Sequence, residues 1–338
     1  MDSKSGLFLL VGVIAGFVAA GGALYNMAGF GQEASAANPK VLKLAHTLDQ
    51  AHPVHVAMEF MAEKVAEKSH GALQVQVFPN GQLGTEPECI AQVQRGAIAM
   101  VKTSAATMEG FVPEMAVFTV PYLFRTEEHY WNVLYGEIGE EFLQMGAGQG
   151  LRGLTYYDSG ARSFYTSKRP VETPADLRGL KVRVMQSDGA IAALNALGAS
   201  PTPVPWGDLY TALQQGMVDG AENNVPSYFT SRHYEVAPHF SLDEHMRIPD
   251  LLLVSESIWT HLSEQERKWL HDAAMESLEF QRELWAEQTE ANLEELESLG
   301  VKIYRPDQSA FAEAVQPYHE RLKQGRLGEY MRRISEVE

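Results

Sequence analysis

The chain of 338 residues carries 27 Lys and Arg against 44 Asp and Glu, so its formal net charge is −17. This charge argues against nucleic acid as a partner, because nucleic-acid binding depends on clustered Lys and Arg, and an anionic ligand would need positive side chains placed locally against the field of the whole protein. The hydrophobic fraction of 45% is that of a globular protein, and the length favours two lobes over one compact core. The single cysteine, Cys89, excludes an intrachain disulfide.

The first 36 residues have the layout of an export signal. Lys4 precedes an uncharged apolar run over residues 6–25, and small residues follow up to the sequence ASAA at residues 34–37. A basic start, an apolar middle and an A-x-A site predict cleavage after Ala36 and export of the mature chain to the periplasm. An uncleaved membrane anchor is the alternative, because about 20 apolar residues are long enough to span a bilayer.

The first half of the mature chain alternates strands and helices. Alternating apolar residues predict strands over residues 40–48 and 73–79, and helical spacing predicts a helix over 55–69. A second helix over 86–96 leads into a strand over 97–101. This order predicts a parallel sheet in an α/β fold.

The second half repeats this order. Residues 173–179 have the capping chemistry of a short helix, and a strand over 180–184 follows. Helices are predicted over 188–198 and 207–216, and an extended stretch comes next. This repeated winding suits a second lobe of the same class.

Three adjacent hydrogen-bonding side chains, Glu222, Asn223 and Asn224, stand where that extended stretch ends. We expect them to interrupt any regular element. They form either a plain turn, which needs only one Asn or Gly, or the polar wall of a cleft for a polar ligand.

The last third begins with an apolar, strand-like segment over residues 251–259. Ser263 and Glu266 form the capping box sequence S-x-x-E, and a helical pattern follows to Leu299. A helix of this length is unusual in a globular protein. The alternatives are one long helix or two helices that break near residues 288–289.

The common signatures of enzymatic chemistry, G-x-S-x-G, the P-loop and H-E-x-x-H, are absent from the sequence. A G-x-G-x-x-G pattern over residues 148–153 follows a predicted helix and precedes a strand, the reverse of a dinucleotide-binding motif. His52 and His55 fit loop histidines better than metal ligands. We predict no catalytic residue, no metal and no cofactor, and a secreted hydrolase or lyase stays an alternative because Ser and His are plentiful.

Two arginines lie at the ends of predicted strands. Lys181 and Arg183 share one face of the strand KVRV, which is either an edge in water or directed into a cleft. Arg162 follows a Ser-Gly turn. The guanidinium forks of Arg183 and Arg162 could converge on one carboxylate, with amide donors from Asn223. Three aromatic side chains could add flat walls to such a cleft or could equally pack in a core: Trp206, Tyr210 and Tyr228.

Five segments in this order closely resemble the solute-binding proteins of TRAP transporters, the DctP-type family. They are FPNGQLGTEPECIAQVQRGAIAM, VFTVPYLF, GARSFYT, TPADLRGLKVRV and LGASPTPVPWGDLYTALQQGMVDGAENN. The resemblance covers nearly the whole mature chain, and the spaced set of segments is far more specific than any one of them.

The resemblance implies an α/β, two-lobed periplasmic-binding-protein fold with crossing strands between the lobes and a long C-terminal helix. Lobe 1 would comprise residues 38–159 and about 249–288, and lobe 2 residues 160–248 and about 289–338 with the C-terminal helices. The lobes would close on a ligand as a hinged trap.

The resemblance also implies a set of ligand-binding residues. Arg183 would pair with a carboxylate of the ligand, with Arg162 and Asn223 beside it and Trp206 as an aromatic wall. Asn224 or Glu222 would address hydroxyl groups. Further contacts are expected from Glu86, Glu88, His46, Lys102, Ser104 and Tyr228.

Members of this family are not enzymes and deliver a small organic acid to a sodium-coupled membrane permease, and we expect a monomer. A ligand-gated sensor module would use the same cleft. The segment SLDEHMRIPD, residues 241–250, resembles a branch that binds sugar acids such as glucuronate or galacturonate. C4-dicarboxylates, sialic acid and α-keto acids remain alternatives, and for a dicarboxylate Lys102 is the one candidate for a second cationic group.

Overall fold

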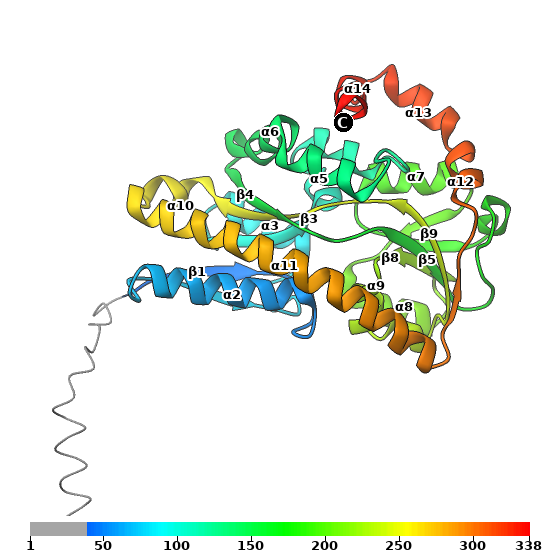
Figure 1. Cartoon of the computed structure of the whole chain (residues 1–338), viewed down its shortest axis with the longest axis horizontal. Helices are drawn as coiled ribbons and strands as arrows, with labels where there is room; N and C mark the ends of the chain where they lie inside the picture. Colours follow the sequence, from blue (N-terminus) through cyan, green and yellow to red (C-terminus); the bar gives the residue numbers. More distant parts are fainter. Residues whose placement is uncertain (1–38) are drawn as a thin grey trace, which may run out of the picture.

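The computed structural model describes residues 39–338, so the predicted export signal lies outside the described residues. Within this range, no helix combines the length and the apolar character that crossing a bilayer requires. The chain forms two α/β lobes, each built around one sheet, as the resemblance implied (Figure 1).

The sheet of lobe 1 has the strand order β2-β1-β3-β10-β4. Its strands are β1 (Lys40–Ala45), β2 (Leu73–Phe78), β3 (Met100–Ser104), β4 (Leu151–Tyr157) and β10 (Asp250–Ser255). The predicted parallel pairing is confirmed for the first three strands, whereas β10 runs antiparallel to both β3 and β4. The sheet is therefore mixed, because β10 enters it from the other lobe rather than through a helical crossover.

Helices cover this sheet, and two of them begin directly after the strands β3 and β10. They are α2 (Pro53–Lys68), α3 (Glu86–Gln94), α4 (Ala105–Met108), α5 (Glu127–Tyr135), α6 (Glu137–Met145) and α10 (Glu256–His261), with 3₁₀ turns at Pro113–Thr119 and Ala147–Gln149. Thr85 and Glu88 form a capping box that starts α3. The helix is followed by Gly96 with a φ of +71°, which a glycine adopts without steric cost.

The sheet of lobe 2 has the order β11-β9-β5-β8-β6-β7. Its strands are β5 (Arg162–Thr166), β6 (Lys181–Val184), β7 (Ser200–Pro203), β8 (Gly220–Asn223), β9 (His239–Met246) and β11 (Lys302–Tyr304). The expectation that Glu222 and Asn223 break regular structure is wrong, since both belong to β8 and pair with β5. Only Asn224 ends the strand.

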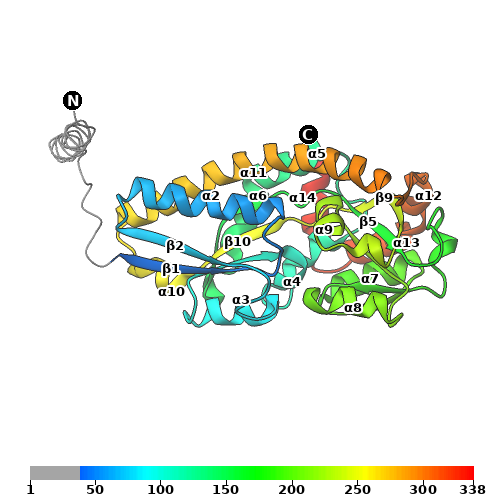
Figure 2. The same ribbon diagram turned by 90° about the horizontal axis from the view of Figure 1, so that it is seen from below.

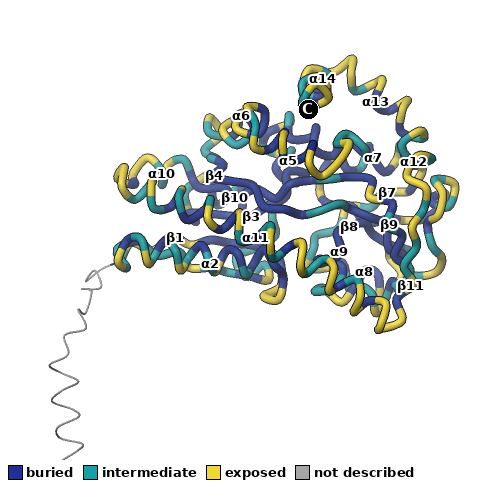
Figure 3. Tube along the Cα trace, in the orientation of Figure 1, coloured by how far each residue is buried: buried dark blue, intermediate teal, exposed yellow. Residues whose placement is uncertain are grey.

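The helices of lobe 2 are short. They are α7 (Asp188–Leu197), α8 (Leu209–Gln214) and α9 (Val225–Thr230), with 3₁₀ turns at Pro174–Leu177, Trp206–Asp208 and His233–Glu235. Thr173 and Asp176 form the predicted cap as a reciprocal capping box. Figure 3 shows that the central strands of both sheets, such as β3, β10, β5 and β8, are buried, while the outer faces of the helices are exposed.

Two short segments and one long helix join the lobes, in addition to the C-terminal segment described below. The chain passes from β4 to β5 over residues 158–161 and returns from β9 to β10 over residues 247–249. Helix α11 (Glu264–Ser298) is a single helix of 35 residues, so the alternative of two helices is wrong. It packs on α2 and β4 in lobe 1 and on α9 in lobe 2, and Figure 1 shows it running along both lobes.

A C-terminal segment runs back from lobe 2 to lobe 1. It consists of α12 (Gln308–Ala314), α13 (Gln316–Lys323) and α14 (Gly328–Glu336). Helix α12 packs on β9 and α7, but Arg125 and Asn132 of lobe 1 donate hydrogen bonds to backbone carbonyls at the end of α14 and beyond. The assignment of all C-terminal helices to lobe 2 therefore needs correction for α14, because the segment is long enough to span both lobes.

Candidate ligand-binding site

A narrow cavity, called the inner cavity, lies between the lobes and is lined by residues of both. Figure 2 shows α3 and α4 of lobe 1 on one side of the boundary between the lobes and α7 and α8 of lobe 2 on the other. A wider cavity of about 270 Å³, called the outer cavity, adjoins it, and Glu86, Arg183 and Trp206 line both cavities. Both lobes supply the lining of the inner cavity: Thr47, Leu48, Glu86, Lys102, Ser104, Ser159, Arg162, Arg183, Met185, Trp206, Asn223, Asn224, Ser227 and Asp250.

Arg183 is a buried cation with no acidic partner among residues 39–338. Its strand β6 lies between β8 and β7, so the alternative of an edge strand in water is wrong. The side chain is 3% exposed, Nε donates to the Val204 carbonyl at 2.9 Å, and the guanidinium lies 5.7 Å from the centre of the Trp206 ring. Burial lowers the pKa of Arg183. The terminal nitrogens are thus left to bind an anion in the cavity.

Arg162, in contrast, is already neutralised. Its Nε and Nη2 donate to the two carboxylate oxygens of Glu222 at 2.5 and 3.0 Å, and Nη2 also donates to the Glu222 carbonyl. Glu222 is 0% exposed, so it serves Arg162 and is not positioned to address ligand hydroxyls. Arg162 Nη1 donates to Asn223 Oδ1 at 2.7 Å. This ion pair holds Asn223 in place beside the cavity.

Asn223 presents its amide nitrogen to the cavity. Its Oδ1 accepts from both Arg162 Nη1 and the backbone N–H of Asn224, which assigns the NH₂ group as the free one. Asn224 starts α9, and its Oδ1 accepts from the Ser227 N–H at 2.8 Å. The run of polar residues at 222–224 therefore divides into an ion-pair partner, an amide donor and a helix cap.

Lys102 lies on the opposite side of the cavity and faces two carboxylates. Its Nζ is 3.0 Å from Asp250 Oδ2 and 3.6 Å from Glu86 Oε1. These charges hold the pKa of Lys102 above its usual value despite burial. Asp250 was not among the predicted site residues, although it closes the segment SLDEHMRIPD; its position in β10 opposite β3 brings it to the cavity.

The remaining predicted residues divide between the cavity and its surroundings. Glu86 accepts from Thr107 Oγ1 at 2.8 Å, and Ser104 caps α4, and both line the inner cavity. Glu88 is engaged in the capping box of α3 and lines only the outer cavity. Its carboxylate is therefore committed to its own helix.

Two predicted residues do not reach the cavity lining. His46 is buried behind Thr47, with Nε2 3.0 Å from His55 Nδ1, and burial lowers its pKa to about 2. Tyr228 is fully buried in the core of lobe 2, and its hydroxyl donates to the Ala237 carbonyl at 2.7 Å. The expectation that Tyr228 forms a wall of the cleft is corrected, because α9 turns this ring away from the cavity and into the apolar interior.

Polar contacts bridge the two lobes beside the cavity. The Glu109 carboxylate of lobe 1 accepts from Ser187 Oγ at 2.5 Å and from the Gly189 N–H at 3.0 Å, at the N-terminus of α7. His52 Nε2 lies 3.1 Å from Ser227 Oγ. Sequence reasoning missed both contacts, since each joins residues far apart in the chain.

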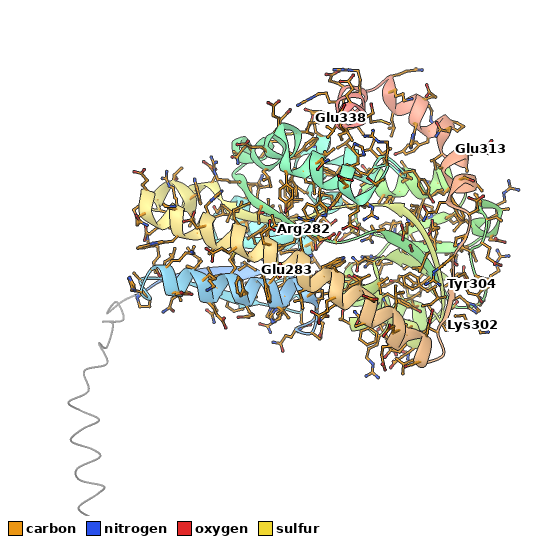
Figure 4. All side chains as sticks on the ribbon, in the orientation of Figure 1. Arg282, Glu283, Lys302, Tyr304, Glu313 and Glu338 are labelled. Carbon is orange, nitrogen blue, oxygen red and sulfur yellow. The ribbon has the colours of Figure 1, made fainter. Side chains whose placement is uncertain are left out.

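A larger cavity, of about 620 Å³, lies where α11 passes the connections between the lobes. Arg282 and Glu283 of α11 line it, and Figure 4 shows them on the part of this helix between the lobes. Its lining holds six acidic side chains against Arg247 and Arg282, a balance that disfavours an organic anion: Glu127, Asp158, Glu244, Glu279, Glu283 and Glu290.

The chain is similar to known proteins in fold and in sequence. A solved TRAP periplasmic solute-binding protein from Bradyrhizobium, in complex with D-galacturonate, is 40% identical, with a TM-score of 0.84 over 87% of this chain and 99% of that chain. One from Chromohalobacter salexigens with bound D-glucuronate is 36% identical, with a TM-score of 0.85 over 88% of this chain and 100% of that chain.

A protein of Escherichia coli is similar in sequence. The 2,3-diketo-L-gulonate-binding periplasmic protein of Escherichia coli is 30% identical over 81% of this chain and 84% of its own length. The family model described as bacterial extracellular solute-binding protein, family 7, matches residues 44–325. The chain therefore belongs to the DctP family of bacterial extracellular solute-binding proteins.

Proposed function

We propose that this protein captures a sugar acid, with glucuronate or galacturonate as the first candidates, in the cavity between its lobes. The observation that carries the proposal is Arg183, a buried cation without an acidic partner among the described residues. A carboxylate would form two parallel hydrogen bonds with its guanidinium and relieve the cost of its burial. The Asn223 amide would donate to the same group.

The rest of the cavity suits a ligand with several hydroxyl groups. Glu86 and Asp250 offer carboxylate oxygens that accept hydrogen bonds, and Ser104 and Ser227 offer hydroxyls. Trp206, beside Arg183, offers a flat apolar face for a carbon skeleton. The ligands named for the two solved relatives, D-galacturonate and D-glucuronate, have this chemistry.

We further propose that the chain is exported by a cleaved N-terminal signal, acts as a monomer in the periplasm and delivers its ligand to a TRAP permease. Family membership and the export-signal pattern in residues 1–36 support this role.

The alternative of a hydrolase has one observation in its favour, the contact between His52 and Ser227. His52 Nδ1 accepts from the Val54 N–H, however, so Nε2 carries the proton and donates to Ser227 Oγ. A nitrogen that already holds a proton cannot remove one from serine, and the pair lacks the base that nucleophilic catalysis needs. We therefore assign this contact to binding the two lobes together.

A ligand screen tests the proposal. The chain without residues 1–36 would be unfolded and refolded to remove carried ligand, then heated with uronates, aldonates, sialic acid, C4-dicarboxylates and α-keto acids. At a thousand times its dissociation constant a ligand stabilises by about 4 kcal/mol, which corresponds to a rise in Tm on the order of 8 °C. A rise with uronates and recovery of the unchanged ligand by NMR are expected. A rise with dicarboxylates or α-keto acids alone would refute the sugar-acid assignment, and turnover would refute a binding protein.

A further inference from the structure

The charges around the cavity are unevenly distributed. On one side Arg183 has no acidic partner among residues 39–338, while on the other side the single cation Lys102 faces the carboxylates of both Asp250 and Glu86. Arg162 is matched by Glu222 and contributes no net charge. The cavity is therefore locally positive at Arg183 and locally negative around Lys102.

We propose that Asp250 and Glu86 set the charge of the ligand: by neutralising Lys102 they restrict the cavity to acids with one carboxylate and reject acids with two. The inference rests on the proposed function, because it concerns which sugar acids the same cavity accepts. The physical reason is that Lys102, the one candidate for a second anion-binding group, is already paired with the protein's own carboxylates, Asp250 and Glu86.

The sheet fixes this arrangement. Strands β3 and β10 are antiparallel, with Asp250 opposite Ser104 and Leu252 opposite Lys102. Asp250 and Lys102 are thus diagonal neighbours on one face of the sheet, within reach of a long side chain. Both are nearly inaccessible, at 6% and 2% exposure, so solvent does not screen the pair.

Glu86 is fixed independently of the sheet. It is the first residue of α3, and its Oε2 accepts from Thr107 Oγ1 at 2.8 Å while Oε1 faces Lys102. A ligand hydroxyl that approaches Lys102 can donate to the carboxylate of Glu86 or Asp250. A ligand carboxylate in the same place would meet two like charges for one cation, which is unfavourable in a water-poor cavity.

The test compares two pairs of acids that share a carbon skeleton. Galactonate and galactarate differ only in a terminal CH₂OH or carboxylate, and gluconate and glucarate provide the second pair. Isothermal titration of the wild-type chain should give a dissociation constant about a hundredfold or more higher for the diacid, because like charges are brought together. In Asp250→Asn and in Glu86→Gln, this ratio should fall by about tenfold or more, because only one carboxylate then faces Lys102 and the local negative charge is removed.

Two controls isolate the mechanism. Adding Lys102→Met to Asp250→Asn should restore the preference for the monoacid, since Glu86 then has no Lys102 beside it and the local charge is negative again. Glu313→Gln removes one negative charge at an exposed position on α12 that lines neither of the two adjoining cavities, at the outer edge of the molecule in Figure 4, and should leave the ratio unchanged. Thermal unfolding without ligand shows whether each variant is folded, and Glu86→Gln tests the proposal by itself if Asp250→Asn does not fold.

Two results would overturn the inference while the proposed function stands. One is tight binding of galactarate or glucarate by the wild-type chain, and the other is an unchanged ratio in both single variants. Failure of the wild-type chain to bind any sugar acid is a different outcome, because it refutes the proposed function and this inference with it.

Discussion

Replacing the two buried arginines of the cavity by methionine, one at a time, should change the stability of the ligand-free chain in opposite directions: Arg183→Met should raise it and Arg162→Met should lower it. In Arg183→Met, the ligand-free chain loses a buried charge that has no acidic partner among the described residues. In Arg162→Met, Glu222 keeps its charge at 0% exposure and loses the guanidinium that neutralises it. The two substitutions remove the same functional group from the same cavity and serve as matched controls.

The magnitudes follow from the partners of each side chain. Breaking a buried ion pair by removing one partner costs about 3–5 kcal/mol, so Arg162→Met should lower the Tm by about 6–10 °C. Arg183→Met loses its hydrogen bond to the Val204 carbonyl and its contact with Trp206, worth about 1 kcal/mol each. It also removes the desolvation cost of a lone cation, several kcal/mol, so we expect a net gain of about 1 kcal/mol or more.

Ligand binding should be weakened by Arg183→Met, although this substitution stabilises the ligand-free chain. Without Arg183, the ligand carboxylate would be buried with no unpaired cation, and the loss of about 3–5 kcal/mol corresponds to roughly two to three and a half orders of magnitude in Kd. Arg183→Lys should also weaken binding, because an ammonium cannot form the two parallel hydrogen bonds of a guanidinium.

Thermal denaturation of the ligand-free chain and titration calorimetry with the best ligand of the screen measure both effects. The reasoning would be refuted by a change of less than about twofold in the Kd of Arg183→Met, which is the behaviour of a surface residue. It would also be refuted if Arg183→Met lowered the ligand-free Tm as much as Arg162→Met does.

Three further predictions concern residues around the cavity. Glu109→Gln should raise the ligand dissociation rate about tenfold in stopped-flow displacement, because it weakens charge-assisted bonds to the N-terminus of α7 across the lobes; an unaltered rate would show that this contact does not hold the lobes closed. Burial lowers the pKa of His46 to about 2 from 6.5, so the unfolded chain binds the extra proton below pH 6.5, and the free energy of unfolding should decrease by up to about 1.4 kcal/mol per pH unit on acidification. Denaturation between about pH 7 and 5 should show a shallower decrease in His46→Gln, and equal slopes would contradict this assignment. Tyr228→Phe should reduce the free energy of unfolding by about 1 kcal/mol through loss of the bond to Ala237 while the Kd stays within about twofold; a tenfold weaker Kd would place this ring at the ligand after all.

The elements with strong local signals could be predicted from the sequence. The capping residues at Thr173 and Ser263 and the glycine after α3 gave correct helix boundaries, because each acts within one turn of the chain. The order of strands and helices predicted the α/β class for the same reason. The prediction was wrong where a strand begins or ends through pairing with a distant strand, as at β8, whose hydrogen bonds to β5 extend regular structure through Glu222 and Asn223.

The candidate site was predicted in part. Arg183 and Asn223 line the cavity, as the resemblance implied, because both stand at the ends of strands that meet at one sheet edge. Nothing local distinguishes Arg183 from Arg162, however, since only the neighbouring strand decides that one is paired with Glu222 and the other is not. Asp250 was missed, because its role depends on β10 entering the sheet of lobe 1 beside β3.

By itself, the sequence determined the alternation of strands and helices, the family resemblance and the residue types that an anion-binding cleft requires. These properties reside in periodicity, capping and short motifs, which act over a few residues. Only the tertiary structure decided which charges remain unpaired: Glu222 reaches Arg162 across 60 residues, and Asp250 reaches Lys102 across 148. Electrostatic energy depends on distance and burial in space, so the chemistry of the cavity is decided by how the two sheets and their connections bring distant side chains together.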